Sequence, residues 1–375
     1  MYNLLLSGYA IDVFEPIAKW TSIGVVAALI VLGLLLFVFK RDSFAKFVKY
    51  ALFGMLVYLL VVGIAGLVME IAKSFNPNYV EENYMDRQAV TTYIFIPVTC
   101  LLVLFLITAI ATAITAKKSS PESAKKNVKK TLTVCGIIDL IGLIATGALL
   151  SIYFEKVKEW YATLNQPVLY ISASLVVVVI IILSFLLDRN EKSFDTRCLS
   201  LAGITIAMSF GLSYIKIFEM PQGGAITLFS LLPVMIFSYI YGTKKGVFIC
   251  FIYGILQAIQ DPWIIHPAQF LLDYPVAFAA IGLAGAFANL KTFENIPQIS
   301  FLLGGILAGS IRFVSHVLSG VFAFASTFAG DLDSWLYSLG YNSFVFIDLA
   351  IVLAIGVIVF SSKAFSKELN KITIK

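Results

Sequence analysis

Apolar runs of about 20 residues recur along the whole chain, separated by short polar interruptions. An α-helix needs a run of this length to cross the hydrocarbon core of a bilayer, because each residue advances the helix by about 1.5 Å. We count about eleven such runs. The sequence therefore predicts an all-α integral membrane protein with about eleven transmembrane helices.

The composition supports this interpretation, since 60% of the residues are hydrophobic and 13% are charged. A soluble globular domain carries roughly 25% charged residues. The mean hydropathy is +0.93, so most of the surface must face lipid. The formal net charge of +5 does not indicate a nucleic-acid partner, because Lys and Arg gather beside the ends of the apolar runs, where they mark membrane topology.

The predicted spans fall into two groups, which a short charged connector at 188–197 separates. We place the first five at about 22–39, 50–73, 92–116, 131–153 and 167–187. We place the last six at about 198–217, 225–242, 246–261, 272–290, 300–324 and 344–361. The sequence thus predicts a five-helix module over 1–190 and a six-helix domain over 191–375. The first run lacks a small-residue cleavage site, so we expect it to be retained and not removed as a signal peptide.

Lys and Arg cluster in alternate loops, and acidic residues occupy the loops between them. The basic segments are 40–49, 117–130, 189–197, 244–245, 291 and 363–375. Cytoplasmic loops of membrane proteins carry such an excess of positive charge. We therefore expect a multi-pass protein of the cell membrane with its N-terminus outside and its C-terminus in the cytoplasm.

The polar stretches are too short for a soluble catalytic domain. The four cysteines lie in or beside apolar runs, and their spacing is not that of metal ligands. We therefore expect neither a metal site nor disulfides, and no cofactor. An intramembrane enzyme with Asp273 and His316 as acid and base is an alternative, but no nucleophile or metal-ligand motif accompanies the pair.

Ionisable residues inside a span indicate function by default, because a charge at mid-bilayer costs about 3 kcal/mol. Arg312 lies well inside the run 300–324, and His316 follows one helical turn later on the same face. Arg312 has two interpretations: an ion pair that joins helices, with Asp273, Asp348 or Asp139 as partner, or a role beside a binding site. His316 alone would suit a hydrogen-bonded core histidine.

The predicted topology brings a set of polar and aromatic residues to one depth near the outer surface. The set comprises Asp273, Tyr274, His316, Tyr337 and Asn342, with the aromatic rings of Trp263, Phe324 and Trp335 nearby. A carboxylate, an imidazole, an amide and several rings suit a flat, cationic, nitrogen-rich ligand. An interfacial aromatic belt is the alternative interpretation of the rings.

Three blocks of sequence carry a resemblance to a known family. They are QFLLDYPVAFAAIGLAGAF at 269–287, RFVSHVLSGVFAF at 312–324 and YSLGYN at 337–342. In this order they resemble the thiamine-specific S component (ThiT family) of energy-coupling factor (ECF) transporters, over roughly 198–363. The N-terminal helices do not match that family.

The resemblance implies a substrate-binding role for eight residues: Asp273, Tyr274, His316, Gly320, Tyr337, Asn342, Trp263 and Phe324. Arg312 would contact these residues and not the ligand itself. The chain departs from some family members in three ways. Asp273 replaces a Glu, Phe324 replaces a Trp, and the outer loop 218–226 lacks a capping Trp.

The resemblance also implies the biological role. An S component captures thiamine from outside, and a transmembrane coupling subunit with two ATPase subunits supplies the energy; this chain has no P-loop. Gly203 and Ala207 form a small-xxx-small pair that would dock the coupling subunit, although such pairs also pack helices within one bundle. An S component for a thiamine precursor or another heterocyclic vitamin remains an alternative.

Overall fold

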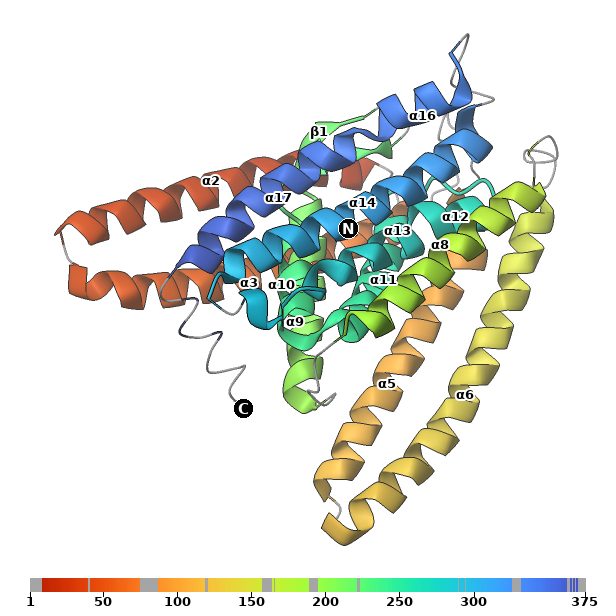
Figure 1. Ribbon diagram of the computed structural model, residues 1–375, viewed down its shortest axis with the longest axis horizontal. Helices are drawn as coiled ribbons and strands as arrows, with labels where there is room; N and C mark the ends of the chain where they lie inside the picture. The colour runs from red at the N-terminus through yellow and green to blue at the C-terminus, as the bar shows by residue number, and fades with distance from the viewer. Residues whose placement is uncertain are drawn as a thin grey trace.

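The computed structural model shows a largely helical protein (Figure 1). It describes residues 9–39, 41–74, 87–118, 121–156, 164, 166–188, 195–220, 223–288, 290–293, 295–325, 332–362, 365, 367 and 369. Most of the charged connector, residues 189–194, lies outside this part of the chain.

The N-terminal module contains two helical hairpins and one further long helix. Its elements are α2 (Tyr9–Phe39), α3 (Arg41–Ser74), α4 (Arg87–Val90), the π-helix η1 (Thr91–Phe95), α5 (Ile96–Lys118), α6 (Pro121–Lys156) and α8 (Gln166–Leu186). Helices α2 and α3 form one hairpin, and α5 and α6 form the other, which extends away from the rest of the molecule (Figure 1).

The C-terminal domain adds a small β-hairpin to a helical bundle. Its elements are α9 (Thr196–Ser213), β1 (Lys216–Glu219), β2 (Ala225–Thr227), α10 (Leu232–Tyr241), α11 (Thr243–Gln260), α12 (Pro267–Asp273), α13 (Pro275–Ile281), η3 (Gly282–Gly285), η4 (Lys291–Phe293), α14 (Pro297–Ser319), η5 (Gly320–Phe324), α16 (Ser334–Asn342) and α17 (Phe344–Ser361).

The predicted all-α membrane class is confirmed. Among the described residues, seven helical segments have the length and apolar composition to cross a membrane: Pro16–Phe39, Lys126–Lys156, Gln166–Leu186, Thr196–Ser213, Pro267–Gly285, Pro297–Phe324 and Ser334–Ser361. Shorter apolar helices cover Thr91–Leu101 and Leu232–Tyr241.

Two predicted spans differ from the structure. The span at 225–242 is wrong in its first part, where β2 pairs with β1 and a helix of ten residues follows. The span predicted at 272–290 is present but shifted, since the apolar segment covers Pro267–Gly285. It consists of α12, α13 and η3, with a break at Tyr274 between α12 and α13. Pro275 explains the break: proline disfavours helical backbone in the preceding residue, whose φ is −115° and ψ is −87°.

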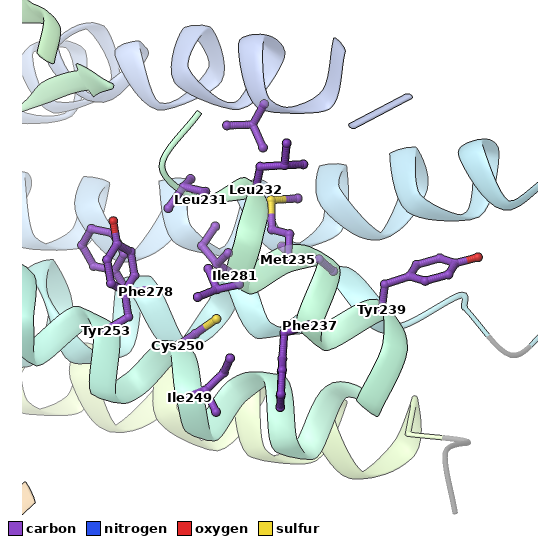
Figure 2. Packing of buried hydrophobic residues seen from close by; sticks show 14 of the residues in the cluster. Leu231, Leu232, Met235, Phe237, Tyr239, Ile249, Cys250, Tyr253, Phe278 and Ile281 are labelled. Carbon is purple, nitrogen blue, oxygen red and sulfur yellow. The ribbon is translucent and has the colours of Figure 1, made fainter. Parts of the chain in front are cut away.

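The core of the C-terminal domain surrounds α10. Figure 2 shows Phe237 of α10 pointing toward α11, which carries Ile249 and Cys250, whereas Met235 lies on the other side of α10. There, a Cβ atom added at Gly305 of α14 would lie 2.9 Å from Met235 Cε. The rings of Tyr253 and Phe278 meet edge to face at 5.2 Å. This packing fixes the relative positions of the helices that carry the candidate site.

The N-terminal module packs against the C-terminal domain along α9. A Cβ atom added at Gly211 would collide with the carbonyl oxygen of Leu59, and one added at Gly66 would collide with the ring of Tyr214. The two glycines therefore allow α3 and α9 to approach closely.

Helix α8 lies along α11 with opposite direction. Near its C-terminus, the carbonyl oxygen of Ser184 accepts a hydrogen bond from Thr243 Oγ1 at the start of α11 (2.7 Å). Near its N-terminus, the ring of Tyr170 lies 5.1 Å from that of His266, which follows α11. Helices of the N-terminal module thus contact the C-terminal domain at both α9 and α11.

Candidate functional site

A cavity of about 140 Å³ lies at one end of the C-terminal bundle, between the β-hairpin and the ends of several helices. It is lined by all eight residues with a predicted substrate-binding role: Trp263, Asp273, Tyr274, His316, Gly320, Phe324, Tyr337 and Asn342. Arg312 also lines it. The structure thus brings together residues that the sequence spreads over about 80 positions.

The β-hairpin forms one wall of the cavity. Its turn contains Gly223, whose φ of +86° lies in the region that favours glycine. The amide of Gly224 donates to the hydroxyl of Tyr341 at 3.3 Å, and Lys216 lies 3.4 Å from Asp261. Of the segment 218–226, where a capping Trp is lacking, the described residues Gly223, Gly224 and Ala225 line the cavity.

Asp273 lies at the centre of a hydrogen-bonded group. Its Oδ1 atom is 3.1 Å from His316 Nδ1, and its Oδ2 atom accepts from Ser319 Oγ (2.6 Å) and Gln269 Nε2 (2.7 Å). Asp273 ends α12, whereas His316 and Ser319 are three residues apart on one face of α14. The carboxylate thereby fixes the orientation of the imidazole ring.

Two buried nitrogen atoms of the cavity lining have no hydrogen-bond partner among the described residues. They are His316 Nε2 and Arg312 Nε. A buried polar atom without a partner costs roughly 1–3 kcal/mol. A ligand in the cavity that hydrogen-bonds these atoms would recover that cost.

The ion pair of Arg312 is formed with Asp348, which selects one of the three partners that the sequence left open. Arg312 Nη1 lies 3.3 Å from Asp348 Oδ2, and both side chains are buried. The backbone amide of Thr227 donates to Asp348 Oδ1 at 3.0 Å. Asp139 instead accepts a hydrogen bond from Thr108 (2.9 Å) within the α5–α6 hairpin.

Tyr274 holds the backbone that carries Trp263. Its hydroxyl accepts from the amide of Trp263 and donates to the carbonyl oxygen of Asp261, both at 2.7 Å.

The rings of Tyr337 and Tyr341 stack, with their centroids 6.1 Å apart and an interplanar angle of 20°. The cavity therefore offers aromatic surface suited to a flat ligand.

Asn342 and Gly320 join the end of α14 to α16. Asn342 Nδ2 donates to the carbonyl oxygens of Ser338 (3.0 Å) and His316 (3.3 Å). A Cβ atom at Gly320 would collide with Ser338 and crowd Asn342. Gly320 thus allows α16 to lie close to the cavity.

Three neutral polar residues of the cavity lining were not predicted from the sequence. Ser213 Oγ donates to Gln260 Oε1 at 2.6 Å, and Gln257 Nε2 donates to Ser213 Oγ at 3.0 Å. All three residues line the cavity. The only sequence signal for them is their position at the ends of apolar runs.

Trp335, which the sequence analysis places near the pocket, is not among the residues that line the cavity. Its ring meets Phe322 edge to face at 5.9 Å, and the side chain is largely exposed. The turn of α16 that presents Tyr337 and Tyr341 to the cavity directs Trp335 elsewhere.

Gly203 and Ala207 lie on α9, away from the cavity. Gly203 is exposed, and a Cβ atom added there would meet no atom within 4 Å. Ala207 is half-buried. Their docking role stays a prediction.

The charged residues of the lining do not cancel. Three carboxylates, those of Asp261, Asp273 and Asp348, stand against the basic groups of Lys216 and Arg312. Counted by formal charge, these five side chains leave one net negative charge. Within the described part of the chain, no three His, Cys, Asp or Glu side chains form a potential metal site.

Comparison with known proteins assigns the C-terminal domain. Residues 199–369 match the family model described as Thiamine transporter protein (Thia_YuaJ). The thiamine transporter ThiT of Bacillus subtilis (strain 168) is 35% identical over 144 residues, which cover 36% of this chain and 74% of that protein. ThiT of Lacticaseibacillus paracasei (strain ATCC 334) is 26% identical over 168 residues, which cover 41% of this chain and 83% of that protein.

The aligned residues cover 74% and 83% of the two relatives but only 36% and 41% of this chain. Both relatives are therefore about half as long as this chain. The five N-terminal helices fall outside the family match. Through residues 199–369, the chain belongs to the thiamine transporter (ThiT) family, a family of membrane transport proteins and not of enzymes.

Proposed function

We propose that the protein is the substrate-binding subunit of an ECF-type importer and that it captures thiamine from outside the cell. The observation that carries the proposal is the convergence of all eight predicted binding residues on one cavity. The family match supports thiamine as the ligand.

The chemistry of the cavity fits thiamine well. Thiamine combines a flat aminopyrimidine ring with a thiazolium ring that bears one positive charge. The net negative lining and the faces of Trp263, Tyr337 and Phe324 suit the cation. His316 Nε2 offers a hydrogen bond to the pyrimidine. Phosphate esters of thiamine would bring negative charge to a negative lining, so we expect free thiamine to bind more tightly.

The positions of the basic residues indicate on which side of the membrane the cavity opens. Helix α11 begins beside Lys244 and ends at Gln260, which lines the cavity. The basic end and the cavity end of the bundle are therefore opposite. If the basic end is cytoplasmic, as in most membrane proteins, the cavity opens to the outside, with the N-terminus outside and the C-terminus inside.

Energy for uptake would come from partner subunits. We place the coupling transmembrane subunit against α9 at Gly203 and Ala207, with two ATPase subunits bound to it. Thiamine would be released when the coupling subunit stabilises a bundle conformation with lower affinity. We also propose that the functional boundary lies between 1–190 and 191–375, so that the S component is the second unit.

An uptake assay tests this function. The protein is expressed in bacteria that lack thiamine import, with and without an ECF coupling module, and entry of radiolabelled thiamine is measured. We expect ATP-dependent uptake when the module is present. Uptake of an unrelated heterocycle with no uptake of thiamine would reject the substrate, and equal uptake without the module would reject the ECF partnership.

A further inference from the structure

The loop between α11 and α12, residues 261–266, carries Trp263 into the cavity and is contacted from both sides. We call it the Trp263 loop. On its inner side, the hydroxyl of Tyr274 bonds the backbone at Asp261 and Trp263. Gln269 adds a second attachment, because its Nε2 donates to the carbonyl oxygen of Trp263 at 2.7 Å.

Gln269 also links this loop to the central carboxylate. The same Nε2 atom donates to Asp273 Oδ2 at 2.7 Å, and Gln269 Oε1 accepts from the amide of Ile265 at 3.0 Å. The backbone position of the loop and the position of Asp273 therefore depend on one buried amide side chain.

The outer side of the Trp263 loop is held by the N-terminal module. Tyr153, near the end of α6, is fully buried, and its hydroxyl donates to the carbonyl oxygen of Ile264 at 3.2 Å. The ring belongs to a hydrophobic cluster that joins Ile94 and Phe95 of η1 to Ile259 of α11. This contact joins residues 111 positions apart.

A second helix of the N-terminal module contacts the end of the same loop. The ring of Tyr170 in α8 lies 5.1 Å from that of His266. His266 caps α12, since its Nδ1 accepts from the amide of Ala268 at 3.1 Å. Burial lowers the pKa of His266 to about 4, so the ring stays neutral at physiological pH and Nδ1 remains an acceptor.

We propose that the N-terminal module is an intramolecular support for the binding site, with Tyr153 as the positioning residue that fixes the Trp263 loop against α6. The module lies outside the match to the ThiT family, so this support is an addition to the transporter domain. As far as the ligand is concerned, the inference rests on the proposed function.

The first test reads the loop without any ligand. Trp20, Trp160 and Trp335 are replaced by Phe, so that Trp263 is the sole tryptophan of the full chain, and quenching of tryptophan fluorescence by acrylamide is measured in detergent. Tyr153→Phe keeps the ring and removes the hydroxyl. We expect it to raise the quenching constant of Trp263 by about twofold or more, because the loop loses an attachment.

The matched control is Tyr58→Phe in the same module. The hydroxyl of Tyr58 lies 2.9 Å from both Thr21 and Ser22, within the α2–α3 hairpin. This variant removes a similar hydrogen bond without contact to the Trp263 loop. Equal quenching of Trp263 in both variants would overturn the proposal.

The second test measures thiamine dissociation from the full chain that retains its four tryptophans. We expect Tyr153→Phe to speed dissociation about two- to tenfold, the effect of one lost hydrogen bond, while Tyr58→Phe leaves it unchanged. Tyr170→Leu, at an exposed side chain, is a second variant that should also speed dissociation if the module supports the loop. If Tyr153→Phe and Tyr170→Leu each lower the melting temperature but leave thiamine dissociation unchanged, the contacts stabilise the fold alone and the proposal is rejected.

The two tests separate this inference from the proposed function. If the protein binds no thiamine but Tyr153→Phe still exposes Trp263, the support stands and the substrate assignment fails. If thiamine binds and neither quenching nor dissociation changes, the substrate assignment stands and the support is rejected.

Discussion

His316 Nδ1 lies 3.1 Å from Asp273 Oδ1, although the residues are 43 positions apart and belong to different helices. The contact leaves the other ring nitrogen, His316 Nε2, buried in the cavity lining and without a hydrogen-bond partner among the described residues. The carboxylate and the imidazole therefore act as one unit in the proposed site.

We predict that Asp273→Ala and His316→Ala each weaken thiamine binding by about 1–3 kcal/mol, because each leaves a buried polar partner unsatisfied. The double variant should lose less than the sum, since the residues share an interaction. Calorimetry provides the affinities. Asp188→Asn, at the opposite end of the bundle, serves as the control, and unchanged affinity in both single variants would remove the pair from the site.

Breaking the ion pair of Arg312 with Asp348 should destabilise the protein strongly. Arg312→Met leaves a buried carboxylate without its cation, which typically costs about 3–5 kcal/mol. Asp348→Asn leaves the guanidinium unpaired and should also lower the melting temperature. Thermal unfolding in detergent measures both. If each variant melts like the wild type, the pair is not a structural link between α14 and α17.

Replacing Ala207 with Trp should separate binding from transport. The added bulk lies on α9 away from the cavity, so thiamine binding by the isolated protein should persist, while uptake with the coupling module should fall because the helices can no longer approach closely. We expect Gly203→Trp to have the same effect, with binding kept and uptake lowered. Loss of binding and uptake together would indicate that the two residues pack within the bundle.

Much of the helical architecture could be predicted from apolar run length, because a membrane helix must satisfy its own backbone hydrogen bonds. The β-hairpin at 216–227 was not foreseen, since its short strands sit within a segment of mixed apolar character. The break before Pro275 carried a local signal, and an unbroken span was nonetheless predicted.

The prediction of the candidate site rested on charged, aromatic and family-matched residues, and it missed the neutral residues that contact them. Gln269 precedes Asp273 by four positions and Ser319 follows His316 by three, so helical spacing already placed both beside the pair. The role of Tyr153 had no such signal, because its partner is a backbone carbonyl 111 positions away. Packing between modules of this kind depends on tertiary structure.

Cysteine labelling tests the proposed orientation. In a chain whose four native cysteines are replaced, Asp333→Cys should react with a membrane-impermeant thiol reagent in intact cells, because this exposed residue caps α16 at the cavity end. Lys126→Cys, in the basic N-terminal part of α6, should react only after permeabilisation. The reverse pattern would invert the topology.

The most direct test of the central claim is titration of the purified full chain with thiamine, followed by intrinsic fluorescence and checked by calorimetry. We predict saturable quenching with one site per chain, loss of much of the signal in Trp263→Phe but little in Trp160→Phe, and no competition by riboflavin or biotin. Trp160 lies outside the described residues. Absence of thiamine binding by calorimetry, while another heterocycle saturates the protein, would contradict the substrate assignment.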